Sequence, residues 1–270
     1  MIRPILLKVL PKDGTILEAG CGLGQWIVYL ARQGYRMAGV ELVEECVKIC
    51  KNVYPDMDIR SGDVRALPYP DGSFAGMISL GVVEHLIEGP EQAVREMART
   101  LRPGGIAVVT VPAFNFFMRA WYPVRRVLVD IFRWNPWVRK AMGRPPAAGD
   151  AGQAAEALRD LRSRTRPEFW PALGMEDGKA AFIEYKCRKG QIDGVMESAG
   201  FEVVESSPLR HPFSYRDIFG GIFLERGGGA EGTPELNLAG RVLDGLFRAF
   251  GPHFFNYMYL VVARKKERSP

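Results

Sequence analysis

The sequence contains few of the residues that build metal centres and disulfide frameworks. Its 270 residues include only three histidines and four cysteines. The cysteines, at positions 21, 46, 50 and 187, form no C-x-x-C pair, which is the spacing of zinc and thioredoxin-like sites. We therefore expect no metal ion, and we expect the cysteines to stay reduced, as is usual in the cytoplasm.

Long hydrophobic runs are missing as well. No uninterrupted apolar segment approaches the roughly 18 residues that a membrane-spanning helix needs. Residues 1–14 contain an apolar stretch, but Lys8 breaks it, Pro11 stops it, and no small-residue cleavage site follows. This pattern predicts a short amphipathic helix and not a signal peptide.

Charge of one sign is in only slight excess. The 36 lysine and arginine residues against 31 aspartate and glutamate residues leave a formal charge of +5. Such a balance is compatible with an anionic partner but does not require one. Length and composition are ordinary for a soluble globular protein with a substantial core.

A regular alternation of strand and helix patterns fills the first half of the chain. Amphipathic segments between apolar, β-rich ones predict helices, and the expected strands are 15–20, 36–41, 57–60, 74–80 and 106–111. The regularity then fails and returns with a helix and a strand over 190–206 and a last strand over 256–265. The alternation predicts an α/β three-layer sandwich with a mostly parallel sheet. Ligands of such sheets bind beyond the carboxyl ends of the strands, where the strand order reverses.

A glycine-rich turn follows the first expected strand, in LEAGCGLGQW at residues 17–26. The dinucleotide fingerprint G-x-G-x-x-G would place its third glycine where this chain has Gln25. Glu18 precedes the turn, where it would be a poor neighbour for a pyrophosphate and a good one for an ammonium group. The motif therefore favours a ligand with a cationic amino-acid end. A tight strand-to-helix turn without any ligand is the alternative, because short glycine motifs are weak evidence.

Two further carboxylates fall at successive strand ends. Glu41 ends the second expected strand, where a carboxylate can accept both hydroxyl hydrogens of a ribose. Asp63 follows the third and can accept from an adenine amino group, with Leu42 and Val64 as apolar neighbours of the ring. Each carboxylate taken singly is equally consistent with a solvated loop. Their order along the sheet favours a nucleoside site.

Taken together, these segments resemble the motifs of the seven-stranded, class I S-adenosylmethionine-dependent methyltransferases. The segments that carry the resemblance are LEAGCGLGQW, GVEL, GDVRALPYPDGSF, SLGVVEHL and LRPGGIAVVTVP. The resemblance covers residues 13–112 closely, and 186–206 and the final strand more loosely. It implies a Rossmann-like sheet of seven strands, the last one antiparallel between the fifth and the sixth. It also implies an enzyme with S-adenosyl-L-methionine as its cofactor.

The resemblance also assigns the cofactor-binding residues. It implies that Glu41 holds the ribose and that Leu80 lies under the cofactor. The adenine would lie among Leu42, Asp63 and Val64. The residues expected around the methionine part are Glu18, Gly20, Cys21, Gly22 and Gly24, and Trp26 is a further cofactor-binding candidate.

Methyl transfer from a sulfonium requires mainly alignment of the acceptor and exclusion of water. A general base is needed only if the acceptor holds its proton strongly near neutral pH. His85, just beyond the fourth expected strand, is the candidate base, with Glu84 beside it as a second catalytic candidate. Two alternatives remain: His85 orders the loop beneath the cofactor, or the pair belongs to a metal site, for which no further ligand cluster is visible.

Residues 113–185 and 207–255 are expected to be insertions in a single methyltransferase domain over 1–270, forming a mostly helical substrate cap. Between Arg119 and Arg144 there are seven basic residues and one acidic residue, with three tryptophans among them. This composition is typical of an interfacial helix. A second apolar stripe precedes the last strand and comprises Leu238, Val242, Leu243, Leu246, Phe247 and Phe250. The alternative is that both helices simply cover the sheet.

These features favour a small, lipophilic acceptor such as a quinone precursor, a lipid or a lipid-linked glycan. A peripheral contact with the inner face of the membrane follows as a further expectation for a cytoplasmic protein. Nucleic acid is disfavoured, because the Asn-Pro-Pro-aromatic signature is missing after the fourth expected strand. RNA or protein methylation, nicotinamide-dependent oxidoreduction, and cofactor binding without turnover stay open as alternatives.

Overall fold

The computed structural model describes residues 2–129, 151–219, 221–225 and 234–267. The chain divides into two compact units. The first unit comprises Met1–Pro112, Gly190–Leu209 and Met258–Pro270, and the second comprises Ala113–Lys189 and Arg210–Tyr257. That the insertions of the second unit cap the substrate stays a prediction.

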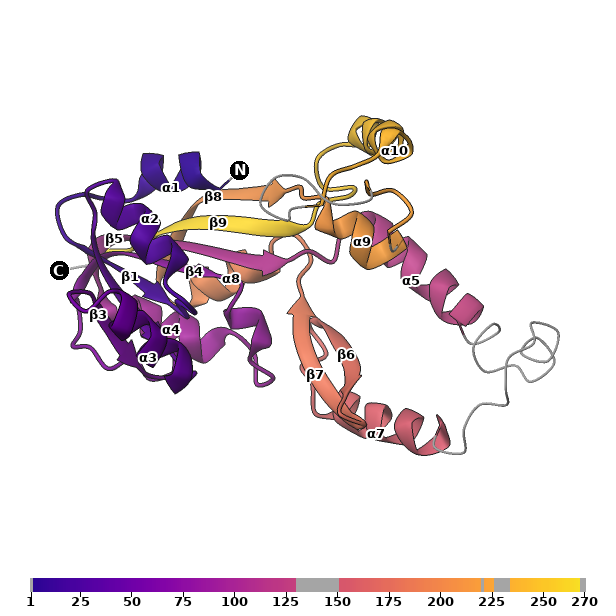
Figure 1. Ribbon diagram of the computed structural model, residues 1–270, viewed down its shortest axis with the longest axis horizontal. Helices are drawn as coiled ribbons and strands as arrows, with labels where there is room; N and C mark the ends of the chain where they lie inside the picture. Colours follow the sequence, from indigo (N-terminus) through magenta and orange to yellow (C-terminus); the bar gives the residue numbers. More distant parts are fainter. Residues whose placement is uncertain (1, 130–150, 220, 226–233, 268–270) are drawn as a thin grey trace. The chain divides into compact units, whose positions relative to one another are not determined.

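Seven strands of the first unit form one sheet in the order β3-β2-β1-β4-β5-β9-β8 (Figure 1). Their bounds are Thr15–Ala19 (β1), Arg36–Glu41 (β2), Asp58–Ser61 (β3), Phe74–Leu80 (β4), Leu101–Pro112 (β5), Phe201–Leu209 (β8) and Met258–Lys265 (β9). The strand β9 runs antiparallel to both of its neighbours, β5 and β8. The pairs from β3 through to β5 are parallel. The predicted seven-stranded sheet, with its last strand antiparallel between the fifth and the sixth, is confirmed.

The helices of the first unit fall where the amphipathic segments predict them. They are Arg3–Val9 (α1), Gln25–Arg32 (α2), Glu44–Val53 (α3), Glu91–Thr100 (α4) and Gln191–Ser198 (α8), with a 3-10 turn at Val83–His85 (η1). Figure 1 shows α4 and α8 on the side of the sheet opposite to α1 and α2. Both faces of the sheet are therefore covered, and successive strand residues such as Met77 and Ile78 are both buried.

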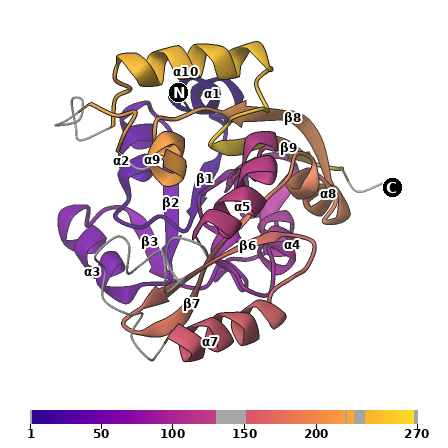
Figure 2. The same ribbon diagram turned by 90° about the vertical axis from the view of Figure 1, so that its right-hand side faces the viewer.

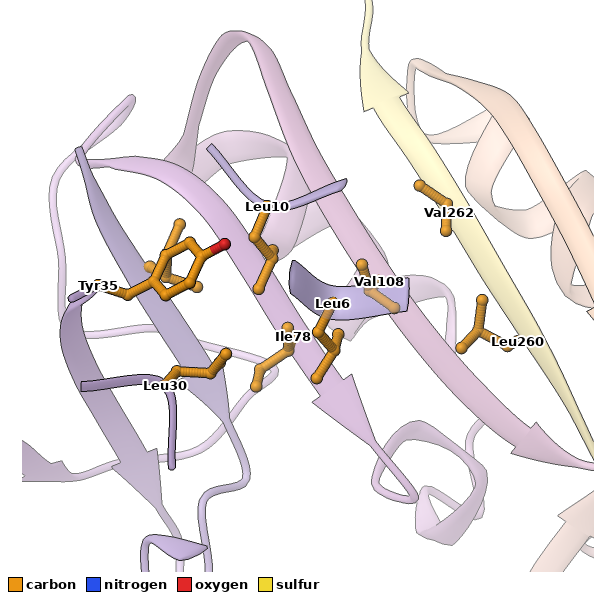
Figure 3. Close-up of a cluster of buried hydrophobic side chains, with 9 residues drawn as sticks. Leu6, Leu10, Leu30, Tyr35, Ile78, Val108, Leu260 and Val262 are labelled. Atoms are coloured by element: carbon orange, nitrogen blue, oxygen red, sulfur yellow. The ribbon is translucent and has the colours of Figure 1, made fainter. Parts of the chain in front are cut away.

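The hydrophobic core on the α1 and α2 side is drawn in Figure 3. Leu6 of α1, Leu30 of α2 and Ile78 of β4 are fully buried in it. Burying one such side chain contributes about 1.5–3 kcal/mol. This core fixes α2, and with it the turn that leads into α2, against the sheet.

The second unit contains α5 (Phe116–Val129), α7 (Ala151–Ser163), α9 (Phe213–Phe219), α10 (Leu238–Ala249) and the strands β6 (Trp170–Glu176) and β7 (Lys179–Lys186). The strands β6 and β7 form an antiparallel hairpin that the sequence analysis did not predict. Figures 1 and 2 both show α7 lying along this hairpin. A cluster of buried side chains joins α5, α9 and α10, namely Met118, Tyr215, Ile218, Phe247 and Phe255.

The described residues contain no helix that is both long and apolar enough to cross a bilayer. Trp134 and Trp137, part of the expected interfacial segment, lie outside the described residues, as does most of the glycine-rich stretch before α10.

Candidate functional site

Several strands of the first unit end level with one another at one edge of the sheet. The register pairs Ala19 with Val40 and Glu41 with Ser61, and it sets β4 beside β1. The strand order reverses between β1 and β4, which is where open α/β sheets bind ligands. The residues predicted for cofactor binding and catalysis lie at the ends of these strands or just beyond them.

The glycine turn between β1 and α2 is anchored on the second strand. The main-chain N–H groups of Gly20 and Cys21 both donate to the carbonyl of Val40, at 2.8 and 2.9 Å. Gly20, Gly22 and Gly24 all have positive φ, at 83°, 51° and 74°, a conformation that residues with a Cβ rarely adopt. A Cβ on Gly20 would lie 2.5 Å from a methyl carbon of Val82. The turn therefore requires glycine at position 20 for both backbone conformation and space.

Glu18 is buried at the end of β1, with 3% of its surface exposed. Its carboxyl oxygen Oε2 accepts a hydrogen bond of 3.1 Å from the main-chain N–H of Ile27, in the first turn of α2. Burial raises the pKa of Glu18 to about 8, because desolvation disfavours the charged form. A cationic group brought close to this carboxyl would favour its ionised form.

Glu41 ties the end of β2 to the glycine turn. Its Oε2 accepts from the N–H of Gly22 at 2.9 Å, and its Oε1 accepts from the N–H of Val43 at 3.0 Å. A carboxylate offers about four lone-pair positions, so each oxygen keeps capacity for one more donor. The next residue, Leu42, is 64% exposed. Glu41 is thus held in one orientation, and its oxygens keep the capacity to accept from two hydroxyl groups.

Asp63, after β3, is clamped by Arg65. The Arg65 Nη2 lies 2.7 Å from Asp63 Oδ2, and the main-chain N–H of Arg65 donates to Oδ1 at 2.7 Å. Hydrogen bonding to the Arg65 side chain lowers the pKa of Asp63. Arg65 also contacts Glu88 at 3.1 Å. Asp63 is therefore held as an ionised acceptor, followed by the buried Val64.

Three other predicted cofactor residues lie in packed surroundings. Trp26 packs edge-on against Tyr29, with ring centroids 5.8 Å apart. Trp26 and Leu80 both pack against the core cluster of Figure 3. Cys21 is buried, and its burial raises the pKa of its thiol to about 12. The Cys21 side chain is thus a neutral packing group, not a nucleophile.

The two catalytic candidates lie next to each other in η1, just beyond β4. Glu84 is buried, with 3% exposed, whereas His85 is exposed to solvent. Gly81 precedes them with a φ of 77°. The structure thus offers His85 to solvent at the edge where the other predicted site residues gather, and its role in proton transfer stays a prediction.

Two residues that shape the site, Gly39 and Val82, are not among those predicted from the sequence. A Cβ on Gly39 of β2 would lie 2.5 Å from Ile27 Cδ1 and 2.9 Å from Cys21 Sγ, so glycine here lets the turn and α2 pack onto the strand. An isolated glycine inside a strand pattern is the signal that predicts such a close approach. Val82 closes over Gly20 and carries no comparable signal in the sequence.

Within the described ranges, no three His, Cys, Asp or Glu side chains form a group that could hold a metal ion. The cysteines at positions 21, 46, 50 and 187 are free thiols.

Comparisons with known proteins match the same region. Residues 17–109 match the family described as "Methyltransferase domain". The chain is 39% identical over 97 residues to a probable S-adenosylmethionine-dependent methyltransferase of Mycolicibacterium smegmatis, covering 36% of this chain and 37% of that protein. It is 34% identical over 144 residues to the 2-methyl-6-phytyl-1,4-hydroquinone methyltransferase of Synechocystis, covering 48% of this chain and 42% of that protein. The aligned segments thus span less than half of either relative.

The fold is similar to that of a solved S-adenosylmethionine-dependent methyltransferase from Methanosarcina mazei. The TM-score is 0.60 at 13% sequence identity, and the likeness covers 97% of both chains. These comparisons confirm the resemblance drawn from the sequence motifs and the fold that it implies.

Proposed function

We propose that this chain, whose residues 17–109 belong to the methyltransferase domain family, transfers the methyl group of S-adenosyl-L-methionine to a small, lipophilic acceptor. The observation that carries the proposal is the hydrogen-bonded link from the glycine turn to Glu41, because it prepares one carboxylate for a ribose diol beside a turn shaped for a ligand. The family match supports S-adenosyl-L-methionine as the cofactor, and the geometry of the residues at the strand ends supports their proposed roles in binding it.

The residues at the strand ends fit the parts of the cofactor in order. The buried Glu18 suits the ammonium of the methionine part, because pairing with a cation offsets the cost of ionising a buried carboxyl. Glu41 suits the ribose. Asp63, held ionised by Arg65, suits the adenine amino group, with Val64 beside the ring. When bound, the cofactor supplies an activated methyl group, and this chain positions it and excludes water.

The second unit is proposed to bind the acceptor. Its described residues are rich in aromatic side chains. One buried cluster joins α5, α9 and α10 and comprises Met118, Tyr215, Ile218, Phe247 and Phe255. Apolar and aromatic side chains are the groups that line sites for lipophilic ligands, so the composition of this unit supports a lipophilic acceptor. The Synechocystis relative, named for a phytyl hydroquinone, supports the same class of acceptor at 34% identity.

The test is a transfer assay with S-adenosylmethionine that carries a labelled methyl group. The protein is incubated with a lipid extract and, in parallel, with polar metabolites, bulk tRNA and an unfolded protein mixture. Label in the lipid extract alone supports the proposal. Label in tRNA or protein alone contradicts the acceptor class, and no transfer to any arm despite cofactor binding contradicts the enzymatic role.

A further inference from the structure

The helix α10 exposes a continuous row of large apolar side chains. Leu238, Val242, Leu246 and Phe250 follow one another at intervals of four residues and are 79%, 60%, 59% and 71% exposed. Residues four apart share one face of a helix. Ala239 and Ala249 lie within the same arc and are also exposed. Four exposed large hydrophobic side chains on one face mark an interaction surface, because single exposed ones are normal but contiguous ones are not.

The opposite side of α10 fixes which face is exposed. Phe247 is buried in the cluster with Tyr215 and Phe255, and its ring lies 4.5 Å from that of Phe255. The side chain of Asn237 caps the helix by accepting from the N–H of Gly240 at 2.9 Å. Gly240 itself is packed against the carbonyl of Phe223, where no Cβ fits. The rotation of α10 is therefore set by packing within the second unit, and the apolar row cannot simply turn inward.

The apolar surface continues from α10 to the start of α5. Phe250 stacks on Phe254 with ring centroids 4.8 Å apart, and Phe254 lies 5.9 Å from Phe116, which is 62% exposed. We call Phe116 and Phe254, together with the row on α10, the α10 face: Phe116, Leu238, Val242, Leu246, Phe250 and Phe254.

Positive charge accompanies the α10 face. On the helix, Arg241 and Arg248 flank one side of the row, with side chains 63% and 68% exposed. Arg241 is paired with the half-exposed Glu225, and Arg248 with the mostly buried Asp244. The exposed pair of Arg241 and Glu225 is weak enough to exchange partners. The segments of the second unit hold 20 lysine and arginine residues against 13 aspartate and glutamate residues, a charge of +7. Those of the first unit hold 16 against 18, a charge of −2.

We propose that the α10 face docks on an anionic lipid bilayer, with the apolar row in the interfacial region and the flanking arginines at the phosphates. The inference rests on the proposed function in one respect, since a lipophilic acceptor would then be taken up from the bilayer itself. An amphipathic helix with an apolar row and basic residues beside it has the composition of an interfacial helix. Lysine and arginine near such a surface each contribute about 1 kcal/mol.

Lipid fits this face better than nucleic acid does. A nucleic-acid surface needs basic and aromatic side chains at the contact, whereas the centre of this row is aliphatic, at Leu238, Val242 and Leu246. It also fits better than a second copy of the chain, because two copies of a unit that carries +7 would repel each other.

The test is sedimentation of the full chain with vesicles of phosphatidylcholine, with and without phosphatidylglycerol, at several salt concentrations. We expect binding to the anionic vesicles that weakens with salt. Val242→Glu is expected to weaken that binding about tenfold or more, because a carboxylate replaces an inserted side chain and faces anionic lipid. Leu238→Glu is a second variant that is expected to fold normally, since a carboxylate is favourable in the first turn of a helix. The matched control is Val53→Glu in α3, another exposed helical valine, at 57%.

Three results would overturn the proposal. The first is no sedimentation of the unaltered protein with either vesicle. The second is equal binding by Val242→Glu, Leu238→Glu and Val53→Glu. The third is a shift of oligomeric state or of RNA binding, and not of vesicle binding, in the two α10 variants. Titration of each variant with S-adenosylmethionine separates this outcome from failure of the proposed function, because the α10 variants are expected to bind the cofactor as the unaltered protein does.

Discussion

The main-chain N–H of Ile27 donates to the buried carboxyl of Glu18 across 3.1 Å, which joins the end of β1 to the first turn of α2. This hydrogen bond favours the charged form of Glu18, yet burial outweighs it and raises the pKa to about 8. At neutral pH the carboxyl therefore holds its proton in the free protein for most of the time. A ligand that places an ammonium beside Glu18 favours the release of that proton.

Cofactor binding is therefore expected to depend on pH. Between pH 6 and 7, affinity for S-adenosylmethionine should rise by up to about tenfold per unit, since the free protein gives up a proton on binding. The rise should end near pH 8, where Glu18 is already ionised and an α-amino group, with a pKa of about 7.7–8.0, loses its charge. Titration calorimetry in two buffers of different ionisation enthalpy measures the proton release. Glu18→Gln, which keeps an acceptor for Ile27, should remove both the release and the pH dependence.

The raised pKa of Glu18 should also make the free energy of unfolding depend on pH. Between the ordinary pKa of about 4.5 and the raised value of about 8, the unfolded chain ionises Glu18 while the folded chain keeps the proton. The free energy of unfolding should therefore fall as pH rises through this window, by roughly 1 kcal/mol per unit from this group. Urea unfolding of Glu18→Gln should show a smaller fall with pH than the unaltered protein shows. Parallel curves for the two proteins would contradict the assignment of a raised pKa to Glu18.

Substitution of Gly20 should damage the site more than substitution of another glycine with positive φ. Gly20→Ala adds backbone strain and a clash with Val82, so we expect a loss of about 2–4 kcal/mol in unfolding free energy. Gly104 has a φ of 73° with no atom within 4 Å of an added Cβ, and Gly104→Ala should cost only the strain, about 1–2 kcal/mol. Only Gly20→Ala is expected to weaken cofactor binding. If Gly20→Ala and Gly104→Ala changed cofactor affinity equally, the assignment of the glycine turn to the cofactor site would be contradicted.

His85→Ala tests the predicted base. If His85 takes a proton from the acceptor, turnover should fall by about 10²–10⁴-fold while cofactor affinity is kept. Loss of cofactor affinity in this variant, with or without loss of turnover, would instead assign His85 to the support of the loop after β4.

Most of the first unit could be predicted because the hydrophobic pattern of each segment is typical of either a helix or a strand. QWIVYLAR repeats apolar positions at helical spacing and RMAGVE is a compact β-rich segment, and the structure has α2 and β2 at those residues. The hairpin of β6 and β7 was missed although its turn carries a signal. Asp177 and Gly178 both have positive φ, at 49° and 77°, and Asp-Gly between strands is a frequent hairpin turn. The small residues of β6 and β7, such as Gly174 and Ala180, hide the alternation around it.

The residue types of the site could be predicted from the sequence, but the side-chain pairs and the burial of each residue could not. The spacing of Glu18, Glu41 and Asp63 after successive strands predicts that they gather at one edge, since parallel strands end together. Nothing in the spacing predicts that Arg65 clamps Asp63 or that Glu84 is buried while His85 is exposed. The pair of Asp63 and Arg65 is local, two residues apart, but it depends on side-chain conformation, whereas the burial of Glu84 depends on tertiary packing. The spacing of residue types encodes neither.

We propose that the carboxylate of Glu41 and the glycine turn hold S-adenosylmethionine. The most direct measurement is titration calorimetry of the unaltered protein and of folded Glu41→Ala with S-adenosylmethionine and, separately, with a nicotinamide dinucleotide. We expect the unaltered protein to bind S-adenosylmethionine and not the dinucleotide. Glu41→Ala should weaken that binding by about 1–3 kcal/mol through the loss of charge-assisted hydrogen bonds. Unchanged affinity in Glu41→Ala, or binding of the dinucleotide in place of S-adenosylmethionine, would contradict the account.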